Sequence, residues 1–331
     1  MTEPADIQAQ LEKGALQWRE GLYEASLATF ADLARACPRV PAVLDAHVQA
    51  LLGLGQVGAA QQAIDCALAL RPRPPTAVLL AALDAADRSI AASRRLLEPL
   101  LAEIPDFELA RIAWWQLLRE PPPGRTFPAT ALEQAMVEST EWIEEHGAAP
   151  WTAFACQVLD QALAAATAPG LVVECGVFHG RSLRQLALAS GAECHGFDSF
   201  EGLPEAWLDH PRGAYSTRGS RPAMPDNVTL WPGWFEDTLP GFARERSDQR
   251  IALLHIDCDL YSSTVCVLEA LHPLIDADTV LVFDDLCGLP GWQQHEYRAL
   301  REWCDRESRH VEVLAATRVG REVALKALPR R

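Results

Sequence analysis

The sequence predicts an all-α region followed by an α/β domain built on a doubly wound, mostly parallel sheet. About the first hundred of the 331 residues are rich in Ala and Leu and show helical periodicity. From Pro169 onward, short apolar runs alternate with helical segments, which is typical of a doubly wound sheet. Near the end, two further runs flank Val319-Gly-Arg321, so we expect an antiparallel hairpin at the sheet edge.

The N-terminal region contains a repeat. Six positions recur at an offset of 34 residues, which is the period of a tetratricopeptide helix pair. They are Gly21, Tyr23, Ser26, Phe30, Leu33 and Pro38, repeated as Gly55, Val57, Ala60, Ile64, Ala67 and Pro72. A weaker third copy covers 87–105, where Pro99 is expected to kink its helix. We therefore predict a tetratricopeptide-like helical domain over residues 1–119, with an ordinary helical bundle as the alternative.

A linker and a connecting helix are expected over 120–150, because Glu120-Pro-Pro-Pro-Gly124 interrupts the helical pattern. The α/β domain follows over 151–331. The connecting helix is expected over 130–146, and a second helix is expected over 152–166. The predicted strands of the α/β domain are 171–177, 193–197, 227–231, 251–256, 279–283, 311–317 and 322–326. The long segment 207–227 between the second and third strands reads either as a functional loop or as a disordered one.

Composition narrows the class of partner. A formal charge of −16 argues against nucleic acid or an anionic membrane as the main partner, since both require a basic surface. The N-terminus lacks the pattern of a signal peptide. The nine cysteines include no Cys-x-x-Cys pair, which fits reduced thiols and a cytoplasmic protein.

Four aspartates follow two of the predicted strands. Asp257 and Asp259 come after 251–256, and Asp284 and Asp285 come after 279–283. Neighbouring strands lie about 4.8 Å apart, so these carboxylates converge if the two strands pair. Like charges that close repel, and the cluster then keeps protons or holds a cation. A single aspartate there is often only a turn or cap residue. Four together predict a metal-assisted enzyme.

The first strand of the sheet leads into a glycine-containing loop. Gly176 and Gly180 allow the backbone to approach a ligand, and the free amides of a helix beginning near Ser182 suit an anionic group. Asp198 lies 22 residues after Gly176, where an acid meets ribose hydroxyls in nucleotide folds. The G-x-G-x-x-G fingerprint is absent, which disfavours NAD and FAD. The loop after Glu174 suits S-adenosylmethionine better.

Five ordered motifs resemble the macrocin O-methyltransferase family over about residues 150–326. They are Glu174-Cys-Gly-Val-Phe-His-Gly180, Phe197-Asp-Ser-Phe-Glu-Gly-Leu-Pro204, Gly233-Trp-Phe-Glu-Asp-Thr-Leu-Pro240, His255-Ile-Asp-Cys-Asp-Leu-Tyr-Ser-Ser-Thr264 and Phe283-Asp-Asp285. The resemblance implies a class I fold and a Mg²⁺-dependent enzyme that transfers a methyl group from S-adenosylmethionine to a sugar hydroxyl of a natural product.

The resemblance also implies roles for individual residues. The metal ligands would be Asp257, Asp284 and Asp285, and Asp259 would be the general base. The cofactor site would include Glu174, Gly176 and Asp198, beside Gly180 and Ser182 of the same loop and helix start. Two features depart from the simplest family members, namely the helical repeats and the segment Trp292-Gln-Gln-His-Glu296, whose His295 and Glu296 receive no role.

Other functions stay open at this point. An Asp-x-Asp motif after a strand also holds the metal in many nucleotide-sugar glycosyltransferases. A tetratricopeptide interaction protein with a degenerate methyltransferase domain is a third reading. Between these, the repeats would recruit a carrier protein, a partner enzyme or another copy of the chain, while the C-terminal domain acts on a hydroxylated small molecule or glycan. His255 alternates with apolar strand residues and is expected to be a packed core histidine.

Overall fold

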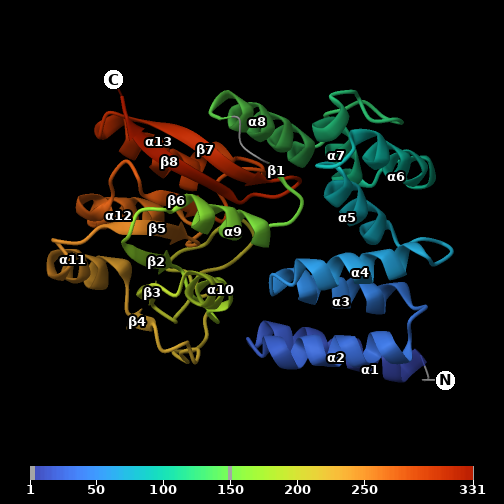
Figure 1. The fold of residues 1–331 in the computed structure, drawn as a ribbon, viewed down its shortest axis with the longest axis horizontal. Helices are drawn as coiled ribbons and strands as arrows, with labels where there is room; N and C mark the ends of the chain where they lie inside the picture. Colours follow the sequence, from blue (N-terminus) through green and yellow to red (C-terminus); the bar gives the residue numbers. More distant parts are fainter. Residues whose placement is uncertain (1–3, 148–150, 331) are drawn as a thin grey trace. The chain divides into compact units, whose positions relative to one another are not determined.

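The structure, a computed structural model, describes residues 4–147 and 151–330. The chain divides into two compact units, 1–129 and 130–331 (Figure 1). The first is all helical, and the second is a mixed α/β domain. Within the described residues, no helix is long and apolar enough to serve as a membrane span.

Seven helices make up the described part of the N-terminal unit, and each packs against the next in the chain. They are α1 (Pro4–Arg19), α2 (Tyr23–Ala36), α3 (Pro41–Gly53), α4 (Val57–Leu68), α5 (Pro75–Ala85), α6 (Ile90–Glu103) and α7 (Glu108–Leu118). Positions related by the 34-residue repeat have the same backbone conformation or the same burial in both copies. Gly21 and Gly55 take positive φ just before α2 and α4, and Ser26 and Ala60 are fully buried one turn into those helices.

Beyond α7, the buried side chain of Arg111 binds the following segment to the helical unit. The guanidinium of Arg111 donates hydrogen bonds to the carbonyl oxygens of Pro123, Arg125 and Thr126, at 3.0 to 3.1 Å. The side chain is fully buried, and its donors are satisfied by backbone carbonyls. The proline-rich segment expected to be a linker is thus attached to α7.

The C-terminal unit contains one eight-stranded sheet in the order β1-β7-β8-β6-β5-β2-β3-β4. The strands are β1 (Trp151–Thr152), β2 (Leu171–Cys175), β3 (Cys194–Asp198), β4 (Val228–Pro232), β5 (Ile251–Ile256), β6 (Val280–Phe283), β7 (Arg309–Thr317) and β8 (Val323–Pro329). Strand β8 pairs antiparallel with both β6 and β7, and the other pairs are parallel. The expected doubly wound sheet with a terminal hairpin is therefore present.

Helices cover both faces of this sheet (Figure 1). One core cluster joins a strand face to α11 (Phe235–Glu245), α12 (Tyr261–Leu271) and α13 (Glu296–Arg306). The other joins the opposite face to α9 (Cys156–Ala165) and α10 (Arg181–Ser190). Helix α8 (Ala131–Glu145) begins at the N-cap Thr130, whose hydroxyl accepts the amide of Glu133. Two short 3₁₀ turns, η1 (His272–Leu274) and η2 (Trp292–Gln294), precede β6 and α13.

One predicted helix begins later than expected. The helix expected over 152–166 begins only at Cys156, because Trp151 and Thr152 form strand β1 instead. They pair with Ala316 and Thr317 of β7, far away in sequence. A strand of two residues has no periodicity to detect, and its partner is not visible locally.

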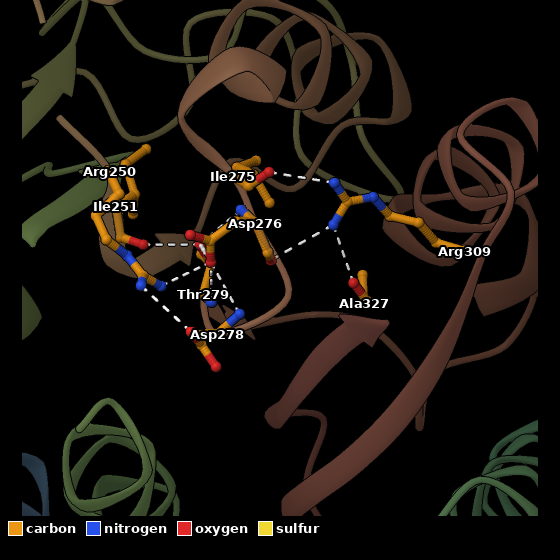
Figure 2. Close-up of polar contacts among 8 residues, drawn as sticks. All are labelled: Arg250, Ile251, Ile275, Asp276, Asp278, Thr279, Arg309 and Ala327. Carbon is orange, nitrogen blue, oxygen red and sulfur yellow. Dashed lines mark hydrogen bonds and ion pairs between the residues drawn. The ribbon is translucent and has the colours of Figure 1, made fainter. Parts of the chain in front are cut away.

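At the amino ends of β5 and β6, charged groups are mutually compensated (Figure 2). Arg250 Nη2 lies 2.6 Å from Asp276 Oδ1, and its Nη1 lies 3.4 Å from Asp278 Oδ2. Asp276 also accepts the backbone amide of Thr279 at 3.2 Å. The Thr279 hydroxyl donates to the carbonyl oxygen of Ile251 at 2.7 Å. On the neighbouring side, Arg309 donates to the carbonyl oxygens of Ile275 and Ala327. This edge therefore has a structural role, because its charged side chains are paired with one another or with backbone groups.

Candidate active site

The two acidic motifs meet at the carboxyl edge of the sheet. Strands β5 and β6 are neighbours, with Ile256 opposite Phe283, so Asp257 and Asp284 leave the sheet at the same level. The amide of Asp284 donates to the carbonyl oxygen of Ile256 at 3.0 Å. This fixes the start of the second acidic segment against the end of the first. The convergence expected from the sequence is therefore real.

Three donor atoms at this edge are close enough to share one ion. One ligand atom each of His255, Asp257 and Asp284 lies within 4.8 Å of the others. Divalent cations bind carboxylate oxygen and imidazole nitrogen at about 2.0–2.6 Å, so donors of one ion lie up to about 5 Å apart. The residues present thus fit a divalent cation.

His255 is held from behind by an acid of the neighbouring strand. Glu174 on β2 is the register partner of His255 on β5. Both side chains are buried, and Nδ1 of His255 lies 2.8 Å from Oε2 of Glu174. Burial lowers the pKa of His255, but the hydrogen bond to Glu174 and its charge outweigh burial and leave that pKa raised. Glu174, expected in the cofactor site, lies beneath the glycine loop and contacts this histidine.

Asp285 is engaged differently from Asp257 and Asp284. Its Oδ1 lies 2.8 Å from Nη1 of Arg321, on the turn between β7 and β8. Its backbone amide donates to Oε2 of Glu296 at 3.2 Å. Glu296 is fully buried at the start of α13, and its Oε1 has no partner among the described residues. Burial and the charge of Asp285 raise the pKa of Glu296 well above its ordinary value.

Crowding at this edge favours protonated carboxyls when no cation is bound. Burial, followed by the charge of Asp284, raises the pKa of Asp257 well above its usual range. Burial and Asp285 raise the pKa of Asp284 as well. Burial, then Asp285 and Asp284, raise the pKa of Asp259 to about 8. A divalent cation removes this repulsion, and its binding releases the protons.

Asp259 sits on a strained turn. Its φ of 62° is in the left-handed region, and the amide of Leu260 donates to the carbonyl oxygen of Cys258 at 2.6 Å. A hydrogen bond between residues two apart, with positive φ between them, is the rarer and more strained form of γ-turn. Aspartate tolerates positive φ better than most side chains. The turn separates this carboxyl from the strand direction followed by Asp257.

The glycine loop is shaped by close backbone packing. Gly176 has a φ of 98°, and a Cβ there would overlap the carbonyl oxygen of Asp257. Gly180, with φ of 73°, is the N-cap of α10, and a Cβ there would lie 2.7 Å from the sulfur of Met224. Ser182 lies in the first turn of α10 and is buried. Gly176 is therefore required, a side chain at Gly180 would be strained by its positive φ, and the loop lies directly beside the first acidic segment.

Asp198 binds the glycine loop through its side chain. Oδ2 accepts the amides of Val177 and Phe178 at 2.8 and 2.7 Å, and Oδ1 accepts the amide of Phe200 at 2.6 Å. The carboxylate thus joins the loop after β2 to the loop after β3. The sequence places Asp198 at this edge, as expected for an acid near a ribose, but does not predict this set of backbone contacts.

The long loop after β3 reaches the acidic edge. Tyr215 has positive φ, and its hydroxyl lies 3.1 Å from Nε2 of His210. Its ring meets the edge of Phe178 with centroids 6.0 Å apart. Burial, followed by the charges of Asp259 and Asp285, raises the pKa of Tyr215 to about 12. At neutral pH this hydroxyl stays protonated and lies beside both the glycine loop and the acids.

Several site residues were missed or undervalued from sequence. His255 precedes Asp257 by two residues, and a strand alternation puts such residues on one face, so a signal was present. Arg321 gave none, because an arginine in a hairpin turn is ordinary and its partner Asp285 is distant in sequence. Glu296 was left without a role, and its contact with Asp285 depends on how α13 packs.

Comparison with known proteins agrees with the motif-based resemblance. A family described as a methyltransferase domain matches residues 173–286, which include the glycine loop and both acidic motifs. The chain is 32% identical over 145 residues to the 8-demethyl-8-(2,3-dimethoxy-alpha-L-rhamnosyl)-tetracenomycin-C 4'-O-methyltransferase of Streptomyces olivaceus, covering 35% of this chain and 53% of that protein. It is 29% identical over 181 residues to the mycinamicin III 3''-O-methyltransferase of Micromonospora griseorubida, covering 46% of this chain and 67% of that protein.

The chain thus spans about half to two thirds of the length of these curated relatives. Among solved structures, the calicheamicin methyltransferase CalS11 is similar, with a TM-score of 0.43 and 19% identity over 66% of this chain and 90% of that one. The expected resemblance to O-methyltransferases is confirmed for the C-terminal unit.

Proposed function

We propose that this chain is an S-adenosylmethionine-dependent O-methyltransferase that acts on a hydroxyl of a sugar or glycosylated small molecule with the help of Mg²⁺. The observation that carries the proposal is the convergence of Asp257 and Asp284 beside Gly176, within the segment that matches a methyltransferase domain. The relative that resembles the chain at 32% identity is named for a substrate with a rhamnosyl group, which supports a sugar as the acceptor.

The cofactor would lie over the glycine loop. Gly176 and Gly180 place no side chain at the two ends of the loop, and the first turn of α10, with Ser182, supplies backbone amides for an anionic group. Asp198 fixes the loop through the amides of Val177 and Phe178 and would lie near the ribose of the cofactor. Glu174 lies on β2, the strand that leads into this loop, and is hydrogen-bonded to His255.

The cation would be held by Asp257 and Asp284, with Asp285 as the further ligand that the resemblance implies. When bound, the ion orients the acceptor and lowers the pKa of the hydroxyl that is methylated. Asp285 is ion-paired with Arg321, so joining the metal requires its carboxylate to leave that arginine or to use its other oxygen. Asp257 and Asp284 need no such change.

Asp259 would accept the proton of the acceptor hydroxyl. It lies next to the proposed ligands, is partly buried, and has a pKa of about 8 in the crowded edge, which a bound cation lowers toward the range of a neutral-pH base. We expect Asp259→Asn to reduce kcat by about 10²–10⁴-fold with little change in S-adenosylmethionine affinity. Asparagine tolerates the positive φ, so the turn is retained. Unchanged kcat would remove Asp259 from this role.

The alternatives have less support. A nucleotide-sugar glycosyltransferase does not explain the match of residues 173–286 to a methyltransferase domain. A degenerate interaction domain does not explain why partly buried carboxylates stay crowded at one edge, since unused charges there are destabilising.

Isothermal titration of S-adenosylmethionine into the purified protein, with Mg²⁺ and then with EDTA, tests the proposal. We expect micromolar binding, followed by methyl transfer to diol-bearing sugars that is lost in EDTA. No binding under either condition would overturn the methyltransferase assignment. Turnover that persists in EDTA would exclude a role for the metal and leave the cofactor assignment standing.

The N-terminal unit is proposed to be a tetratricopeptide-like array that recruits a protein partner. Its support is the equivalence of Gly21 with Gly55 and of Ser26 with Ala60 at the 34-residue offset. Removing residues 1–129 should leave turnover of a small free acceptor within a few-fold. A soluble fragment that binds cofactor but has lost this turnover would place the array in the reaction itself.

A further inference from the structure

The two ring nitrogens of His255 have different surroundings. The side chain is 2% exposed. Its Nδ1 lies 2.8 Å from Oε2 of Glu174, and a carboxylate oxygen can only accept in such a bond, so Nδ1 carries the proton. In the neutral ring, this leaves a lone pair on Nε2. Glu174 therefore fixes both the orientation and the tautomer of the imidazole.

Nε2 points at the acidic edge without a hydrogen bond there. It lies 4.0 Å from Oδ1 of Asp284, which is too long for a hydrogen bond. The donor atoms of His255, Asp257 and Asp284 all lie within 4.8 Å of one another. A buried nitrogen facing two carboxylates at this spacing is what a third ligand of one cation requires.

Resting on the metal role proposed above, we propose that His255 is itself a ligand of the divalent cation through Nε2, with Glu174 as its hydrogen-bond support. Metal-binding histidines donate their second ring N–H to a carboxylate in just this arrangement. The site would then combine one imidazole with carboxylates. Such a donor set favours Mn²⁺ and later transition metals more than an all-oxygen site does, because imidazole is a softer ligand than carboxylate.

A different reading of the same geometry is an imidazolium that joins the two carboxylates of Glu174 and Asp284 by charge alone. In that case a cation would bind oxygen atoms only, and His255 would remain protonated beside it. The two readings differ in whether a nitrogen is bonded directly to the metal. Spectroscopy of a paramagnetic ion can detect that bond.

The test uses Mn²⁺ bound to the full-length protein, observed by electron spin echo envelope modulation. We expect modulation from a directly bonded nitrogen, with the frequencies changing when histidine is labelled with ¹⁵N. His255→Gln should abolish this modulation and weaken Mn²⁺ binding at least about tenfold. Glu174→Gln should weaken Mn²⁺ binding about 10–100-fold while keeping the nitrogen signal. His295→Gln is the matched control and should keep both signal and affinity.

The outcomes separate this proposal from the one on which it rests. Mn²⁺ that binds to the unaltered protein without nitrogen modulation overturns ligation by His255 and leaves a carboxylate metal site standing. No Mn²⁺ binding in calorimetry overturns both the ligation and the metal role. Because the decisive spectrum is that of the unaltered protein, the test does not depend on whether the His255→Gln variant folds.

Discussion

Strands β5 and β6 carry aspartates beyond both of their ends, and the two sets are treated in opposite ways. At the amino ends, Asp276 and Asp278 lie within 2.6 and 3.4 Å of the same arginine, Arg250 (Figure 2). At the carboxyl ends, Asp257, Asp259 and Asp284 crowd together, and burial and mutual repulsion raise their pKa values. The acids at the amino ends are thus paired with an arginine, whereas those at the carboxyl ends are only partly compensated by the positive groups around them.

This difference distinguishes the acids that stabilise the fold from the acids that have another use. A carboxylate that accepts hydrogen bonds from an arginine and from backbone amides, as Asp276 does, stabilises the loop that carries it. Carboxylates that repel each other while buried cost stability, so their presence indicates a use. Sequence alone shows only that acids follow or precede strands. Their neighbours, known from the structure, separate the two kinds.

Neutralising one acid at each edge should give opposite results. Asp257→Asn or Asp284→Asn should lower metal-dependent turnover at least about 100-fold, because a proposed ligand is lost, without lowering the thermal midpoint in EDTA. Asp276→Asn should lower the free energy of unfolding by about 1 kcal/mol and leave turnover unchanged. Methyl-transfer assays and thermal unfolding of all three variants measure both effects. Equal behaviour of Asp276→Asn and Asp284→Asn would contradict the comparison.

Gly176 is packed directly against the backbone of the first acidic segment. Gly176→Ala should reduce the free energy of unfolding by at least about 3 kcal/mol, since its Cβ would overlap the backbone of Asp257. Gly191→Ala is the matched control, with φ of 60° and no atom within 4 Å of its added Cβ. It should cost only about 1–2 kcal/mol. Denaturant titration compares the two, and similar losses would show that the contact with Asp257 is unimportant.

The crowded aspartates at the carboxyl ends of β5 and β6 should make the metal-free protein less stable as pH rises. Carboxyls whose pKa is raised on folding bind protons more tightly in the folded chain, so their contribution is present at low pH and is lost as pH rises toward about 8, the value for Asp259. The thermal midpoint in EDTA should therefore fall between about pH 5 and pH 8, and Mg²⁺ should reduce the fall.

The control for this decline is the Asp257→Asn, Asp284→Asn double variant, in which the crowding is relieved. Its midpoint should vary less with pH over the same interval. A decline as steep as in the unaltered protein would assign the effect to acids elsewhere in the chain.

The smallest effect is expected at Arg321, which is ion-paired with Asp285 at the active edge. Arg321 lowers the pKa of Asp259, opposing the neighbouring acids, and it is about half exposed. Arg321→Met should therefore raise the pKa of Asp259 and move the acidic limb of the pH–rate profile upward, with a loss of roughly 2–10-fold near neutral pH. Arg321→Lys keeps the charge and should shift the profile less. If the pH–rate profiles of Arg321→Met and the unaltered protein were identical, the charge of Arg321 would have no effect on Asp259, because Asp285 neutralises it.

Sequence reasoning was most successful where the signal was local. Strand 251–256 was placed at its observed bounds, and the convergence of Asp257 with Asp284 followed from parallel strands ending at one edge. It failed where partners are distant, as for strand β1 and for the Arg321–Asp285 ion pair. The assignment of His255 to the core is confirmed, since its side chain is buried, but the contact with Glu174 on the neighbouring strand could not be predicted from sequence.

The hydrogen bonds of Asp198 have a consequence for the thermodynamics of cofactor binding. Because its carboxylate holds the amides of Val177, Phe178 and Phe200, the loops after β2 and β3 are ordered before any ligand arrives. A pre-organised surface loses little conformational entropy on binding, so more of the contact energy appears as affinity. Asp198→Ala would shift that ordering into the binding step, which calorimetry would record as a more unfavourable entropy and a slower approach to equilibrium.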